Sequence, residues 1–125
     1  MILFVEDDSL SRRAFAQLLR AEGYQVAEAG NGAQALEILS MGAEVLSNEV
    51  FDLVIADLVL PGVHGVNLVH QIRARWPKMP IIIISGYLSG APGKVILEGF
   101  AEFIQKPLEP AELIAAVRRL LTAKV

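Results

Sequence analysis

The chain has 125 residues, a net charge of −3 and no cysteine, and hydrophobic residues make up 54% of it. The lack of cysteine excludes disulfides and thiolate metal sites, and the slight acidity argues against direct nucleic-acid binding. No segment approaches the roughly 18 uninterrupted apolar residues of a membrane span, so we expect no membrane insertion. We expect one domain, residues 1–125, and a cytoplasmic location because no secretory signal peptide is seen.

Apolar runs of strand length alternate along the chain with stretches of helical spacing. The runs predict five strands, at residues 2–6, 24–29, 51–56, 80–84 and 103–105. Helical spacing predicts helices at residues 9–22, 33–47 and 65–76, and a last helix beginning at Pro110. The glycines within residues 85–99 predict a short, loose helix there. We expect an α/β fold, a doubly wound (βα)5 flavodoxin-like sandwich with a parallel sheet of order 2-1-3-4-5.

Acidic residues follow two of the predicted strands. Glu6 and Asp7 come at the end of the first strand, and Asp57 closes the third. Because these strands are neighbours in the predicted order, the three carboxylates should converge at one edge of the sheet. Their mutual repulsion would be relieved by a hard divalent ion that prefers oxygen ligands, and Mg²⁺ suits such a site. The next acid, Asp8, is placed to cap the following helix.

The same edge carries the remaining groups that phosphoryl transfer needs. Ser85 follows the fourth strand and Lys106 follows the fifth. Asp57 can attack in line, while the cation, the Lys106 ammonium and the Ser85 hydroxyl each face one equatorial oxygen. Taken singly, these residues have plainer interpretations as helix caps, turn residues or solvated loops. Their combination at one edge favours a phosphoacceptor site.

These motifs resemble the receiver domain of a two-component response regulator over nearly the whole chain. The resemblance is carried by residues 5–8 with Arg12, residues 57–62 with Gly65, residues 80–86 and residues 103–107. It implies a role in a phosphorelay, in which a histidine kinase or a histidine phosphotransfer protein is the partner. The phosphohistidine of that partner would pass its phosphoryl group to Asp57 in a Mg²⁺-dependent reaction.

The resemblance also implies how the metal and phosphate are held. Asp7 and Asp57 would bind Mg²⁺ directly and Glu6 through water, although many relatives have aspartate at the position of Glu6. Val59 would contribute its backbone carbonyl to the metal. Lys106 would pair with the phosphate.

Switching is implied for two residues. Ser85 would move toward the phosphate, and the ring of Phe103, which stands where relatives have tyrosine, would reorient. The signal would appear on the surface of the fourth helix, fifth strand and fifth helix. Val59 and Tyr87 offer no amide or carboxylate to orient a hydrolytic water, so we predict slow self-dephosphorylation. The domain would be a switch that assists its own phosphorylation, not an enzyme.

Other classes remain open. A pseudo-receiver, an interaction module with structural acids, would show no Mg²⁺-dependent phosphorylation. An aspartyl-phosphate phosphatase would need an acid where Val59 stands, and a flavodoxin would need a phosphate loop in place of residues 6–8.

Residues 85–87 are similar to those in receivers of hybrid sensor kinases. The high apolar content predicts an exposed patch for homodimerisation or partner binding, and residues 40–50 form a segment about seven residues longer than is usual, roughly two extra helical turns.

Overall fold

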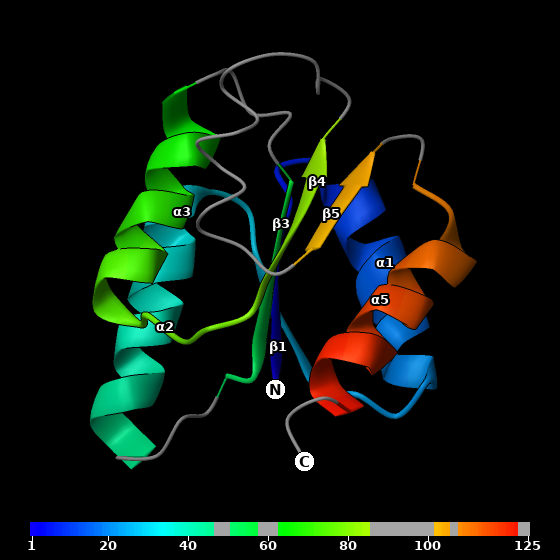
Figure 1. Cartoon of the computed structure of the whole chain (residues 1–125), viewed down its shortest axis with the longest axis horizontal. Coiled ribbons are helices and arrows are strands. Elements are labelled where there is room, and N and C mark those ends of the chain that lie inside the picture. Colours follow the sequence, from blue (N-terminus) through cyan, green and yellow to red (C-terminus); the bar gives the residue numbers. More distant parts are fainter. Residues whose placement is uncertain (47–50, 58–62, 86–101, 106–107, 123–125) are drawn as a thin grey trace.

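The computed structural model describes residues 1–46, 51–57, 63–85, 102–105 and 108–122. Its strands are β1 Ile2–Val5, β2 Val26–Ala29, β3 Leu53–Asp57, β4 Ile81–Ser85 and β5 Glu102–Gln105. Its helices are α1 Ser9–Ala21, α2 Gly32–Leu46, α3 Val63–Arg75 and α5 Pro110–Thr122. The strands form one parallel sheet in the order β2-β1-β3-β4-β5 (Figure 1). The predicted α/β class and the order β2-β1-β3-β4 are confirmed, whereas the helix predicted after Ser85 lies outside the described residues.

The three central strands are aliphatic along almost their whole length because both faces of the sheet are covered. Every residue of β1 and β3 is buried. In β4, Ile81 and the three isoleucines that follow it are at most 1% exposed. The apolar runs therefore located these strands correctly. Asp57 is the last residue of the third strand, where the sequence placed it, and it pairs in register with Ile84 of β4.

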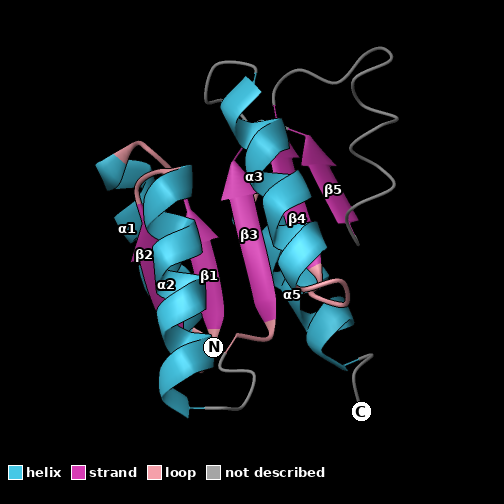
Figure 2. Ribbon diagram, turned by 90° about the vertical axis from the view of Figure 1, so that its left-hand side faces the viewer, coloured by secondary structure: helices cyan, strands magenta, loops and turns pink. Residues whose placement is uncertain are grey.

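Helices cover both faces of the sheet (Figures 1 and 2). Helices α2 and α3 lie over a core that includes Leu3 and Val54, and α1 and α5 lie over a core that includes Phe4 and Ile55. Neighbouring strand residues enter different cores because successive side chains point to opposite faces. None of the described helices has the length and apolar character needed to cross a membrane.

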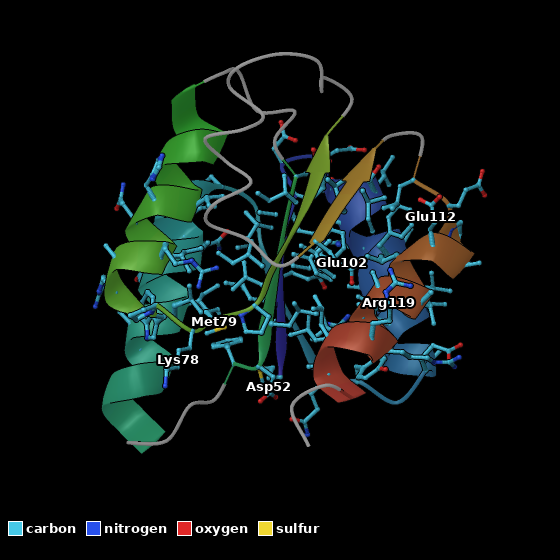
Figure 3. All side chains as sticks on the ribbon, viewed as in Figure 1. Asp52, Lys78, Met79, Glu102, Glu112 and Arg119 are labelled. Carbon is cyan, nitrogen blue, oxygen red and sulfur yellow. The ribbon has the colours of Figure 1, made fainter. Side chains whose placement is uncertain are left out.

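The ends of α1 and α5 follow from local sequence. The side chain of Asp8 caps α1, as predicted, and the chain leaves that helix through Gly23, whose φ of 101° favours glycine. Pro110 occupies the first position of α5, where a missing N–H has no cost. Further along α5, Arg119 forms a two-pronged ion pair with Glu102 of β5, at 2.5 Å between Nη2 and Oε1 and 3.3 Å between Nε and Oε2 (Figure 3).

All strands point the same way, so their carboxyl ends form a single edge of the sheet (Figure 2). Ligand sites in open α/β sheets lie outside this edge, where the strand order reverses. Here the reversal falls between β1 and β3, and these strands are followed by Glu6 or end in Asp57. The fold therefore places the predicted acids at the position expected for a site.

Candidate functional site

Glu6 and Asp57 line one cavity at the carboxyl edge of the sheet. Each residue is 6% exposed, and they are the two buried charged residues in the described part of the chain. Both side chains lie on the α1–α5 face, since Glu6 alternates with Phe4 and Asp57 alternates with Ile55. The cavity has a volume of about 180 Å³. Its lining residues are Phe4, Glu6, Ser11, Phe15, Asp57, Ile84 and Leu108.

This cavity has an apolar floor and an acidic wall. The rings of Phe4 and Phe15 stack at 6.2 Å between centroids with an interplanar angle of 6°. Ile84 and Leu108 complete the apolar part, while Glu6 and Asp57 supply carboxylates. Burying a carboxylate beside hydrocarbon is costly unless a polar or charged partner compensates it. Two carboxylates that share such a cavity also repel each other, and a bound cation would relieve that repulsion.

Glu6 is held in place through three of its groups. Its N–H donates to the carbonyl of Ala29 at 3.0 Å, and its carbonyl accepts from Nη1 of Arg12 at 3.0 Å. Its carboxylate accepts the backbone N–H of Asp8 at 3.3 Å. The side chain thus lies against the start of α1, where the positive end of the helix dipole favours negative charge.

Asp7 and Asp8 differ from Glu6 in exposure and in role. Both are exposed, and Asp7 is not part of the cavity lining. Asp8 accepts hydrogen bonds from the hydroxyl of Ser11 at 2.7 Å and from its N–H at 3.3 Å. The hydroxyl bond, which is the larger effect, and the N–H bond hold the pKa of the Asp8 carboxyl below its usual value. The prediction that Asp8 is a cap is confirmed.

The other predicted site residues are described in part or not at all. The backbone of Ser85 ends β4 and pairs with Gln105, and Phe103 pairs with Ile83. The side chains of Ser85 and Phe103 lie outside the described residues, as do Val59, Tyr87 and Lys106 entirely.

The donor chemistry of the cavity fits Mg²⁺, which binds through one or two carboxylates and keeps several waters. Glu6 and Asp57 provide two such carboxylates, and the exposed carboxylate of Asp7 follows Glu6 directly. Among the described residues, however, no three histidine, cysteine or acidic side chains form a group that could hold a metal ion. The centre of three carboxylates therefore stays a prediction.

Sequence reasoning missed the apolar half of the cavity. Ser11 and Phe15 are four residues apart on α1 and so share a helix face, which was a usable signal. Leu108 gave no such signal because it follows the last strand in a loop. Arg12 was noted as part of a motif, but its contact with Glu6 was not predicted.

Fold and site together define a doubly wound α/β domain with an acidic cavity at the switch point of its sheet. The family model of the response regulator receiver domain matches residues 2–118. The chain therefore belongs to the response regulator receiver domain family of two-component signal transduction. Members of this family are generally phosphoacceptor switches, typically depend on Mg²⁺ and interact with histidine kinases.

Three relatives illustrate the similarity. The sensor kinase CckA of Brucella abortus is 33% identical over 121 residues, which cover 96% of this chain and 12% of that protein. The crystal structure of the receiver domain of a hybrid histidine kinase CckA is 35% identical with a TM-score of 0.74, covering 96% of this chain and 97% of that one. A CheY-like receiver domain protein from Methanospirillum hungatei JF-1 is 30% identical with a TM-score of 0.82, covering 98% and 93%. The chain spans between 12% and 48% of the length of four curated relatives that it matches.

Proposed function

We propose that this receiver domain is a Mg²⁺-dependent phosphoacceptor switch in a phosphorelay, with Asp57 as the phosphorylated residue. One observation carries the proposal: Asp57 is a buried carboxylate at the last position of β3, and it shares a cavity with Glu6 at the carboxyl edge of the sheet. A buried pair of carboxylates at this position is suited to hold a cation beside a nucleophile. The match to the receiver family supports the same role.

The proposed reaction transfers a phosphoryl group from a phosphohistidine of a histidine kinase or a histidine phosphotransfer protein. A carboxylate oxygen of Asp57 forms the new P–O bond while the P–N bond breaks, and the leaving imidazole takes up a proton. Bound Mg²⁺ would supply positive charge at the phosphoryl oxygens. Asp57 and Asp7 would hold it directly, Glu6 through water and Val59 through its backbone carbonyl.

The conformational change would pass from the phosphate to β4 and β5. Lys106 would pair with the phosphate, and Ser85 would move toward it. Ser85 and Phe103 lie on adjacent strands, since β4 pairs with β5 in the register Ile83 to Phe103. A change at Ser85 can therefore reach β5. We propose that Phe103 carries this change to the output surface, which is formed by β5, α5 and the helix that the sequence predicts between β4 and β5.

We further propose that residues 1–125 form one such domain, and that the phosphorylated form is lost slowly because Val59 and Tyr87 cannot orient a hydrolytic water. The similarity to the CckA receiver favours a hybrid histidine kinase as the protein that contains this domain. A homodimer is an additional partner to test. A phosphorylated form that decays within seconds without a phosphatase would contradict the slow loss.

The decisive experiment is incubation with Mg²⁺ and acetyl phosphate, followed by intact-mass measurement. Wild type should gain one phosphoryl group and Asp57→Asn none. Asp52→Asn is the matched control, because Asp52 precedes the opposite end of β3 and should leave phosphorylation intact. An unmodified wild type would overturn the proposal and favour the alternative, a pseudo-receiver that binds partners without phosphorylation.

A further inference from the structure

Arg12 connects helix α1 to the loop that carries the acidic residues. Its Nη1 atom donates to the backbone carbonyl of Glu6 at 3.0 Å, and its Nε atom donates to Oε1 of Glu28 at 3.3 Å. The Arg12 side chain is 18% exposed, so these contacts are largely shielded from water. A guanidinium can serve both acceptors at once because its N–H groups form a rigid fork.

The carbonyl bound by Arg12 belongs to the peptide that joins Glu6 to Asp7. β1 ends at Val5, so this peptide lies just beyond the strand. Glu6 is buried, and a buried carbonyl without a partner would destabilise the loop. By supplying that partner, Arg12 fixes the plane of the peptide and the directions in which the side chains of Glu6 and Asp7 leave the backbone.

We infer that Arg12 is a positioning residue of the phosphoacceptor site, which sets the affinity for Mg²⁺ by holding the peptide between Glu6 and Asp7. The inference rests on the proposed function, because it requires the acidic cavity to bind Mg²⁺. A purely electrostatic role predicts the opposite sign: a guanidinium repels a nearby cation, so its removal should strengthen Mg²⁺ binding. Positioning predicts that its removal weakens binding.

Gly30 supplies a second, independent handle on the same contact. A Cβ atom added at Gly30 would lie 3.2 Å from Nη1 of Arg12, tighter than an ordinary contact. The guanidinium is held by Glu6 and Glu28, so an alanine at position 30 should displace it by a few tenths of an ångström and weaken at least one of these contacts. By contrast, a Cβ added at Gly32 would meet atoms of Leu68 no closer than 3.7 Å, an ordinary van der Waals distance.

Arg20 is a matched control for Arg12. Both arginines lie on α1 and both bind Glu28, since Nη1 of Arg20 is 3.2 Å from Oε2 of Glu28. Beside this ion pair, Nη2 of Arg20 donates a hydrogen bond to the carbonyl of Val26 at 2.8 Å, and not to the acidic loop. Arg12→Gln and Arg20→Gln therefore remove the same charge and the same ion-pair partner but differ in the contact with Glu6.

The test measures Mg²⁺ affinity by calorimetry and by the backbone amide signals of Asp7 and Asp8, with melting temperature as the measure of folding. Arg12→Gln should weaken binding about tenfold, as loss of outer-shell support does in other metal sites. Arg20→Gln should leave binding unchanged. At saturating Mg²⁺, Arg12→Gln should regain phosphorylation by acetyl phosphate, because its defect lies in metal affinity.

Combining the substitutions completes the test. Gly30→Ala should weaken Mg²⁺ binding, but less than Arg12→Gln does. In the Arg12→Gln background it should cause no further loss of Mg²⁺ affinity, because both substitutions act on the same contact. Gly32→Ala should leave Mg²⁺ binding unchanged. Unchanged or tighter binding in Arg12→Gln, or equal weakening in Arg20→Gln, would overturn this inference while leaving the proposed function standing. A wild type that binds no Mg²⁺ would overturn both.

Discussion

Mg²⁺ should raise the thermal stability of this domain, and Asp57→Asn should remove most of the effect. A ligand that binds only the folded state stabilises it by RT ln(1 + [L]/Kd), which is about 2.7 kcal/mol at a concentration of 100 Kd. An unfolding entropy of about 2.1 cal/mol/K per residue gives about 260 cal/mol/K for 125 residues. Dividing the first quantity by the second predicts a rise in melting temperature of roughly 10 °C.

The assay is thermal unfolding followed by circular dichroism in MgCl2 and in NaCl of matched ionic strength, so that charge screening is the same. Wild type and Asp52→Asn should both show the rise, because Asp52 lies before the opposite end of β3. Glu6→Gln should reduce it and Asp57→Asn should reduce it further. A full rise in Asp57→Asn, or none in wild type, would refute the reasoning that these buried carboxylates hold the cation.

Three further predictions concern the fold. The Ser11 hydrogen bonds lower the pKa of Asp8 in the folded state, so the charged Asp8 cap stabilises the fold above the unfolded pKa and this stabilisation is lost on acidification. The free energy of unfolding, measured with urea, should therefore fall more between about pH 5 and about pH 3 for wild type than for Asp8→Asn, whose cap does not titrate. Leu113→Ala should lower the free energy of unfolding by roughly 2–5 kcal/mol, because Leu113 of α5 is fully buried in the core between this helix and the sheet. Leu10→Ala, at a residue 79% exposed, should change it by less than about 0.5 kcal/mol. Arg119→Gln should lower the melting temperature slightly at low salt and not at high salt, because its ion pair with Glu102 is exposed and screened; an equal loss at both salt concentrations would argue against a coulombic contribution.

Much of the fold could be predicted because each local signal agreed with its neighbours. Ile81 and the isoleucines after it could only be satisfied by burial on both faces of a sheet, and the structure buries them. Asp8 indicated the start of α1, because a side-chain acceptor directly before an amphipathic stretch is typical of a helix N-cap. Strand boundaries were predicted less exactly, since β2 and β3 begin at Val26 and Leu53, each two residues later than expected.

The site was predictable for its acids and not for what surrounds them. Glu6 and Asp57 could be brought together from strand order alone, since topology fixes which strand ends meet. The contacts of Arg12 could not be predicted, because a long side chain has many rotamers and its acceptor on Glu28 lies 16 residues away along the chain. The cavity itself also depends on the packing of Leu108, which lies in a loop and which no sequence spacing specifies.

The floor of the acidic cavity is continuous with one of the two cores. Phe4 and Ile84 belong both to the cavity lining and to the core beneath α1 and α5, and Ile84 is the sheet neighbour of Asp57. None of the described residues in the core beneath α2 and α3 lines the cavity. The two halves of the protein interior should therefore differ in their freedom to vary: an engineer could redesign the α2–α3 half for thermostability, while volume changes in the other half would disturb the chemistry above it.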